Sequence, residues 1–178
     1  ASRGSTSPTR PRSRPSAATP SPAAASSPAR SRWLSEATAL QTIGSGAFAL
    51  SPQLTGALKV GPAVTSIGDY AFAETDLNEL DLSDATALQT ISYEAFISNT
   101  QLTGTLKVGP AVTSIGRYAF FDTGLTGIDL SEATALQTIG YGAFIYNPQL
   151  TGTLKVGPAV TSIGQSAFAY TGLTKLDI

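Results

Sequence analysis

Lysine and aspartate side chains recur at the centre of short apolar triplets in this 178-residue sequence, as in Leu58-Lys59-Val60 and Leu80-Asp81-Leu82. Alternation with a period of two predicts short strands whose middle residue points outward. If the strands stack in parallel, opposite charges face each other and contribute about 0.2–1 kcal/mol per pair. We interpret this row of outward-pointing charged residues as a ladder of opposite charges that pair across neighbouring strands, and alternatively as a charged groove that binds a ligand. The outward residues are Lys59, Asp81, Lys107, Asp129, Lys155 and Asp177.

Tyrosines are the second group of candidate binding residues. All six lie in or near the stretch around a repeated Ala-Phe pair, where the copies of the sequence differ most. Tyrosine is favoured at recognition surfaces because it combines contact area with a polar tip. Packing against the core is the simpler interpretation for any single ring, but the cluster predicts a binding edge. The candidates on this edge are Tyr93, Tyr118, Tyr141 and Tyr146, with Tyr70, Tyr170 and Phe121 beside them.

Other chemistry is limited by what the sequence lacks. Without Cys, Met or His there is no disulfide, no Cys/His metal site and no histidine base or nucleophile pair. Nucleotide-binding, nucleophile-elbow and calcium-loop motifs are also absent. We therefore expect no catalytic, cofactor or metal residues and no enzyme activity. No apolar run reaches 18 residues, so no membrane span is predicted in this segment.

Internal repeats supply the elements that position these side chains. The phrase GPAVTSIG occurs at 61–68, 109–116 and 157–164, and ATALQTI starts midway between the copies. Aligned, the two phrases are variants of one 24-residue unit that occurs six times, and two successive units form a 48-residue double repeat. Repeats of fixed length with fixed apolar positions are the signature of a solenoid.

Each unit offers about seven apolar residues for a core. They are a Leu or Val, an Ile three residues later, the Ala-Phe pair, a following Leu and the two flanks of the charged triplet. Each contributes about 1.5–3 kcal/mol only when a neighbouring unit covers it. A Gly after the Ile, replaced once by Ser92, suits a tight corner. Around Ala-Phe we predict at most one or two helical or 3₁₀ turns.

Residues 1–32 form a separate arm. They carry six Arg and no acid, so their charge is +6, whereas residues 33–178 carry −7, which together give the stated −1. The arm has no side chain larger than that of Ala available for burial, which predicts disorder. A flexible linker, an organelle transit peptide, a glycosylated stalk and a phosphorylated segment remain open. Without aromatic residues for base stacking, no nucleic-acid partner is expected.

The repeat register begins at residue 33. Trp33 occupies a position where later units have Asp, and we expect it to cover the open end of the first unit. The predicted organisation is thus an arm over 1–32 and a solenoid over 33–178. Because there is no Met at the start and no polar cap at the end, we expect a fragment truncated at the C-terminus.

The pattern V-T-S-I-G-x-x-A-F followed by L-x-x-L-x-L resembles the BspA-like (Treponema-type) leucine-rich repeats over residues 33–178. The resemblance implies a right-handed curved solenoid with a parallel sheet on one face and short turns or 3₁₀ segments on the other. It also implies adhesion at the cell surface and binding of matrix or host proteins, but it transfers no ligand-contacting residues. A position often filled by Cys or Asn in the family carries short polar residues in all six units here, which we expect to preserve a hydrogen-bonding ladder. These residues are Ser51, Thr75, Asn99, Thr123, Asn147 and Thr171.

Three functional hypotheses follow. The first is a non-catalytic scaffold that binds a protein partner and acts in adhesion. The second is a recognition or targeting segment of a larger enzyme or signalling protein, and the third is a structural spacer. The resemblance favours the cell surface, with organelle targeting by the arm as the alternative.

Overall fold

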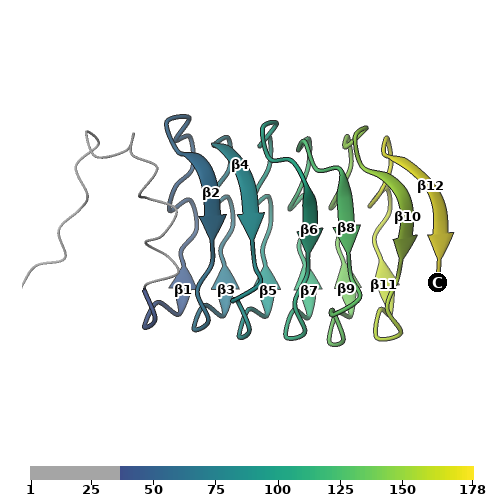
Figure 1. The fold of residues 1–178 in the computed structure, drawn as a ribbon, viewed down its shortest axis with the longest axis horizontal. Helices are drawn as coiled ribbons and strands as arrows, with labels where there is room; N and C mark the ends of the chain where they lie inside the picture. The colour runs from purple at the N-terminus through teal and green to yellow at the C-terminus, as the bar shows by residue number, and fades with distance from the viewer. Residues whose placement is uncertain (1–36) are drawn as a thin grey trace, which may run out of the picture.

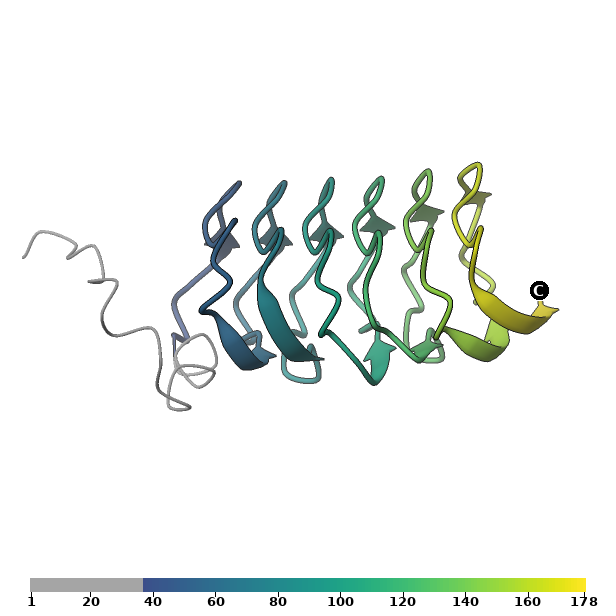
Figure 2. The same ribbon diagram turned by 90° about the horizontal axis from the view of Figure 1, so that it is seen from above.

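The computed structural model describes residues 37–178, which form a solenoid of six stacked coils containing strands and turns and no helix (Figures 1 and 2). The arm, Trp33 and the boundary predicted at residue 33 lie outside the described residues. We number the coils in chain order. They span 37–60, 61–84, 85–108, 109–132, 133–156 and 157–178. The solenoid predicted from the repeats is confirmed.

One face of the solenoid is a six-stranded parallel sheet to which each coil contributes one two-residue strand. The sequence predicted the Ile of each strand as a core residue but no strand at this place. Each Thr or Ser lies outside, and each Ile from coil 1 to coil 5 is buried. The strands are β1 (Thr42–Ile43), β3 (Ser66–Ile67), β5 (Thr90–Ile91), β7 (Ser114–Ile115), β9 (Thr138–Ile139) and β11 (Ser162–Ile163).

The predicted charged-triplet strands exist, but they form three separate pairs and no continuous ladder (Figure 1). Within a pair the charged residues are partners 22 residues apart, as in Lys59↔Asp81. From Asp81 to Lys107 the spacing is 26 residues, and these two strands are not paired. The pairs are β2 (Thr55–Lys59) with β4 (Asp76–Asp81), β6 (Thr105–Lys107) with β8 (Gly127–Asp129), and β10 (Thr151–Lys155) with β12 (Gly172–Asp177).

Two extra residues in each odd-numbered coil account for the unequal spacing. Phe48 precedes Leu58 by ten residues, whereas Phe72 precedes Leu80 by eight. Where β2 pairs with β4, the register shift between Gly56 and Ala57 skips Asn78 of β4, so the bulged residue belongs to the even coil. The expectation of charge pairing at every step was therefore wrong, because it assumed strands at one fixed place in every unit.

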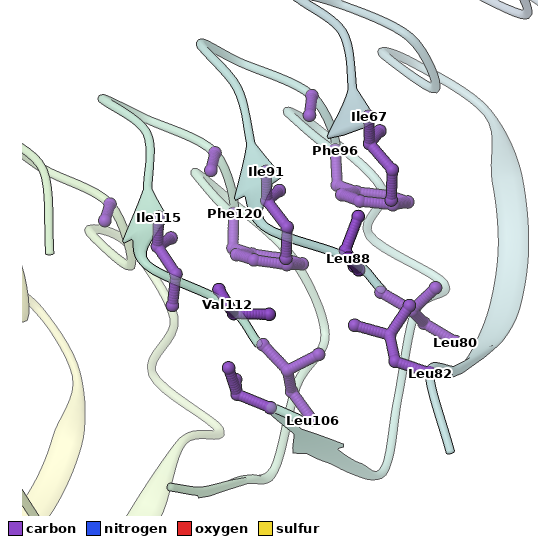
Figure 3. Packing of buried hydrophobic residues seen from close by; sticks show 14 of the residues in the cluster. Ile67, Leu80, Leu82, Leu88, Ile91, Phe96, Leu106, Val112, Ile115 and Phe120 are labelled. Atoms are coloured by element: carbon purple, nitrogen blue, oxygen red, sulfur yellow. The ribbon is translucent and has the colours of Figure 1, made fainter. Parts of the chain in front are cut away.

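Phenylalanines stack at the centre of the core along the whole solenoid. Adjacent ring centroids are 5.1–5.3 Å apart and the ring planes deviate by at most 9°. Phe96 and Phe120 occupy equivalent places in successive coils, beside the Ile and Leu side chains of the same layers (Figure 3). The predicted apolar positions are the core. The stacked rings are Phe48, Phe72, Phe96, Phe120, Phe144 and Phe168.

Buried polar pairs join the coils that the long strands leave unpaired. Asn99 of coil 3 accepts a hydrogen bond from Thr75 of coil 2, and its Nδ2 donates to the Phe72 carbonyl at 2.7 Å. Thr123 and Asn147 repeat this arrangement between coils 4 and 5. The predicted hydrogen bonding thus survives as isolated pairs. We call the joints from coil 2 to 3 and from coil 4 to 5 even-to-odd joints, and those within strand pairs odd-to-even joints.

Candidate functional site

The loops around each Ala-Phe pair carry an exposed aromatic row, which we call the aromatic ridge. Two positions in every such loop have a positive φ angle, among them Tyr118 (56°), Tyr146 (61°) and Tyr170 (56°). This backbone conformation is uncommon for bulky residues and costs about 1–3 kcal/mol when the surroundings impose it. Hydrogen bonds between coils hold it, since the Tyr118 amide donates to the Tyr141 carbonyl at 3.0 Å. The ridge consists of Arg117, Tyr118, Phe121, Tyr141, Tyr146 and Tyr170.

Ring contacts make the ridge one continuous cluster over coils 4 to 6. The Tyr118 ring meets Tyr141 edge-on at 5.3 Å and Phe121 at 5.7 Å between centroids. Phe121 in turn contacts Tyr146 at 5.5 Å, and Tyr146 stacks on Tyr170 at 4.6 Å. Each edge-to-face or stacked pair contributes about 0.5–1.5 kcal/mol beyond the area it buries. The side chains therefore form an ordered surface although Tyr141, Tyr146 and Tyr170 remain exposed.

Gly142 explains where the Tyr118 ring lies. A Cβ atom at Gly142 would come within 2.5 Å of Cε1 and 2.7 Å of Cδ1 of Tyr118, so the ring rests directly on the glycine backbone. The equivalent position one double repeat earlier is Glu94, and the corresponding ring is Tyr70. The glycine therefore distinguishes the ridge from the earlier copy of the same loop.

Arg117 supplies the positive charge of the ridge. Its guanidinium carbon lies 4.9 Å from the ring centroids of both Tyr118 and Tyr141. Such cation–π contacts contribute about 0.5–1 kcal/mol at exposed sites. Hydrogen bonding with Tyr118 raises the pKa of Arg117 and also raises the pKa of Tyr141. The Tyr141 hydroxyl thus stays protonated at neutral pH, and the arginine stays charged and exposed.

A second aromatic pair lies on the same edge, one double repeat earlier. Tyr70 meets Tyr93 edge-on at 5.2 Å, as Tyr118 meets Tyr141. Here Asp69 takes the position of Arg117, and its Oδ1 accepts a hydrogen bond from the Tyr93 amide at 3.1 Å. The Glu94 carboxylate, followed by Tyr70, raises the pKa of Tyr93. This pair therefore has an acidic surrounding, whereas the ridge has a basic one.

The charged strand residues lie on a different part of the surface. Lys59 forms ion pairs with Asp81 at 3.5 Å and Asp84 at 2.9 Å. A hydrogen bond from Ser83 is the largest cause lowering the pKa of Asp81, with the charge of Lys59 acting in the same direction. In the described chain no other ion pair forms on this face, although Lys107 faces Asp129 and Lys155 faces Asp177 in the strand register.

A shallow groove of ≈ 290 Å³ separates the second and third strand pairs. It lies between β8 and β10, which are not paired, and Asp129 and Lys155 line its sides. No metal-ligand cluster of three or more acidic side chains forms within residues 37–178. Those residues also contain no helix that could serve as a membrane span.

The four candidate tyrosines therefore divide between two places. Tyr118, Tyr141 and Tyr146 belong to the ridge, whereas Tyr93 belongs to the acidic pair with Tyr70. Beyond these candidates, the ridge includes Arg117, Phe121 and Tyr170. In the sequence, Arg117 stands out only because the otherwise similar copy of this loop has Asp69 at the same position. The sequence alone does not show that the Arg117 guanidinium lies over two tyrosine rings.

Comparison with known protein families covers all six coils. The chain matches a family model described as BspA type Leucine rich repeat region, in six copies, over residues 33–151 and 65–178. No curated protein matches the chain.

Proposed function

We propose that this chain, which belongs to the family of proteins with BspA-type leucine-rich repeats, is a non-catalytic scaffold that binds a protein through its aromatic ridge. The resemblance seen in V-T-S-I-G-x-x-A-F is confirmed by that membership. Leucine-rich repeats commonly mediate protein interactions, and the solenoid is generally a non-catalytic scaffold. The proposal adds the surface that makes the contact.

The observation that carries the proposal is the ordered cluster of exposed rings around Arg117. Tyrosine and arginine are enriched among residues that contribute most to binding. Rings already packed on one another lose little conformational freedom when a partner covers them, so less of the contact energy is offset. Arg117 is held over two rings and can donate hydrogen bonds to a carboxylate of the partner.

The strand face is the weaker candidate surface. Lys59 is engaged by two carboxylates, so a ligand would have to displace these ion pairs. The remaining lysines and aspartates alternate along the strand face, so this face has no patch of one charge that would attract an oppositely charged ligand. For these residues the interpretation as pairing partners within β2–β4, β6–β8 and β10–β12 is favoured, although Lys107, Lys155 and Asp177 are exposed.

Adhesion to extracellular-matrix proteins is the specific role we propose, on the basis of family membership. The test uses the full chain on immobilised collagen, fibronectin and laminin, with binding followed by surface plasmon resonance. We expect saturable binding to at least one of them. A variant with Tyr141→Ser and Tyr170→Ser should lose at least tenfold in affinity, while Lys107→Ser with Lys155→Ser should bind as the parent does.

Both variant pairs replace exposed residues, so circular dichroism should show a folded chain at the assay temperature and exclude unfolding as the cause. The ridge variant should melt somewhat below the parent, because it loses the Tyr118–Tyr141 and Tyr146–Tyr170 ring pairs. If the strand-face variant loses binding and the ridge variant does not, the ridge assignment is wrong. Absence of binding to all three proteins would reject the matrix-adhesion role. Equal binding by parent and ridge variant to every tested protein would reject the ridge as the contact surface.

A structural spacer is the second candidate function, favoured by the regularity of the phenylalanine stack and of the six-stranded sheet. A spacer requires only length and stiffness, so ridge substitutions should leave it unaffected. If the chain is the recognition segment of a larger enzyme or signalling protein, it would bind through the same ridge. This alternative differs from the first only in the further domain to which the solenoid would be attached. These alternatives are separated by the binding comparison and by the sequence adjoining this chain.

A further inference from the structure

We propose that the outer face of the six-stranded sheet, which we call the hydroxyl face, binds the surface of an ice crystal. This face consists of the outward residue of each short strand and the residue before it. The aromatic ridge and its protein ligand play no part in this contact. Coils 2 to 5, which have a neighbour on both sides, contribute Thr65, Ser66, Gln89, Thr90, Thr113, Ser114, Gln137 and Thr138.

The short strands place their outward hydroxyls in one straight row. Each strand pairs in parallel with the next without a register shift, so that Ser66, Thr90, Ser114 and Thr138 are partners in turn. Figure 1 shows these strands side by side and pointing the same way, and Figure 2 shows them evenly placed along the solenoid. Because neighbouring strands lie about 4.8 Å apart, one hydroxyl recurs at that spacing in every coil.

The hydroxyls of this row do not hold the fold together. Within residues 37–178, none of the four makes a side-chain hydrogen bond, and neither do the amides of Gln89 and Gln137. Thr65 and Thr113 differ, because their hydroxyls donate to backbone carbonyls of the preceding coil at 2.9 Å and 3.1 Å. The face therefore presents hydrogen-bond donors and acceptors that are available to water.

The hydroxyl face carries no charge. Each coil contributes one eight-residue segment that contains the short strand, and no segment contains an acidic, basic or aromatic residue. A neutral face of hydroxyls and amides is complementary to a neutral ligand whose atoms both donate and accept hydrogen bonds, as water does. The segments are 37–44, 61–68, 85–92, 109–116, 133–140 and 157–164.

These segments are repeated without change where it matters for the face. ATALQTI is identical in the three odd coils and GPAVTSIG in the three even coils, whereas the loops around the Ala-Phe pair differ. Burial accounts for inward residues such as Leu88 and Ile91. It does not account for the outward Thr and Ser, because exposed positions without contacts tolerate most substitutions. An exposed row that repeats at every coil fits a ligand that repeats in the same way.

Single contacts on this face are weak. A hydrogen bond that replaces one to liquid water contributes about 0.5–1.5 kcal/mol, so a small molecule touching one coil gains little. A ligand with a fixed repeat contacts all coils at once, and its contacts share one loss of translational and rotational freedom. The stacked phenylalanines hold the coils at a constant 5.1–5.3 Å, so the face is ordered before the ligand arrives.

Ice fits these properties more closely than a neutral polysaccharide does. Oxygen atoms on a face of an ice crystal repeat in straight rows, and each one both donates and accepts hydrogen bonds. Sugar rings also carry hydroxyls, but their C–H faces pack best against flat aromatic side chains, and the six segments contain none. A polysaccharide is therefore the competing ligand in the experiment.

The experiment measures how much of the full chain enters a slowly growing ice hemisphere and how much stays in the remaining liquid. We expect at least fivefold more of the parent than of Thr90→Tyr in the ice, because a ring at the middle of the face keeps the other coils away from a flat surface. Ser114→Tyr, in the next coil, is a second variant with the same expected loss. Tyrosine is favoured on strands, so both variants should fold.

The matched control is Gln101→Tyr, which adds the same ring at an exposed position of coil 3 outside the hydroxyl face. It should enter ice as the parent does, and circular dichroism melts should show that all three variants are folded. A parent that enters ice no more than Thr90→Tyr would overturn the proposal. An equal loss in Gln101→Tyr would show that the hydroxyl face is not the contact surface.

Two comparisons separate this contact from others. Capture of the parent by cellulose or chitin particles, lost in Thr90→Tyr and without entry into ice, would assign the face to a polysaccharide and reject ice. The ridge variant with Tyr141→Ser and Tyr170→Ser should enter ice as the parent does, whatever its affinity for matrix proteins. Exclusion of the ridge variant from ice would contradict the hydroxyl face as the site.

Discussion

Thr75 and Asn99, 24 residues apart in sequence, share a buried hydrogen bond that joins coils 2 and 3 where the long strands β4 and β6 do not pair. Asn99 Nδ2 also donates to the carbonyls of Phe72 at 2.7 Å and Ile97 at 3.3 Å. The side chain therefore replaces part of the missing backbone ladder. The same device recurs at Asn147. The short strands of the six-stranded sheet pair across both kinds of joint, but the even-to-odd joints add buried side-chain hydrogen bonds where the odd-to-even joints add long-strand pairs.

Asn99→Ala should lower the free energy of unfolding by about 1–3 kcal/mol, because the buried Thr75 hydroxyl and the Phe72 carbonyl both lose Asn99 and keep only their mutual hydrogen bond at 3.3 Å. Urea unfolding followed by circular dichroism measures the loss. Gln101→Ala, at an exposed position in the same coil, is the control and should change little. An Asn99 variant as stable as the parent would mean that the joint does not rely on this pair.

Phe96→Ala should lower the free energy of unfolding by about 3–5 kcal/mol, since it empties a fully buried ring site. The ring is stacked on both sides, at 5.2 Å from Phe72 and 5.2 Å from Phe120. Phe48→Ala should cost less, because Phe48 is half-buried and has one described stacking neighbour. Thermal and urea melts of the two variants compare them, and equal losses would argue against stacking as a contribution.

Gly140→Ala should destabilise the chain by about 1–3 kcal/mol, the usual cost of forcing extra volume into a packed site. The new Cβ would lie 2.6 Å from backbone atoms, which cannot move aside as a flexible side chain can. Gly109→Ala is the matched control, since a Cβ there meets nothing within 4 Å. Urea midpoints should fall for the first variant and remain near that of the parent for the second.

Acid should weaken the contact between β2 and β4. The folded-state pKa of Asp81 lies below the ordinary value of 3.8, so its ionised form stabilises the fold above that value. This contribution declines as the pH falls below about 4 through the lowered pKa. Urea titrations at pH 7 and pH 3 should show a smaller loss of stability for Ser83→Ala than for the parent, because the largest cause of the shift is removed.

The pH comparison has a specific control. Ser131→Ala removes the equivalent side-chain hydrogen bond to Asp129, which is the largest cause lowering the pKa of Asp129, while the backbone amide of residue 131 still donates to Oδ1 at 2.9 Å. The two variants should therefore behave alike, and the double variant should show the smallest acid effect. A parent and double variant with the same pH dependence would show that these carboxylates do not contribute.

Much of the fold follows from local information in the sequence. Six units share the same length, the same inward Leu, Ile and Ala-Phe positions, and the same short polar position that Asn99 and Asn147 occupy. One coil conformation must therefore fit all six units. Burial then follows from stacking, because each apolar residue has its own counterpart above and below. The absence of Cys and His likewise limits the chemistry without any structure.

The pairing of the long strands and the composition of the aromatic ridge were decided only by the tertiary structure. Two extra residues before the strand of each odd coil shift that strand relative to the preceding even strand, and the effect on pairing depends on the path that the loop takes. Arg117, Tyr118 and Tyr141 meet because coils 4 and 5 stack, and the Tyr118 ring also rests on the Gly142 backbone. Sequence determines which side chains recur in each coil. Contacts between loops of different coils depend on backbone angles and on neighbouring volumes, which a one-dimensional repeat does not specify.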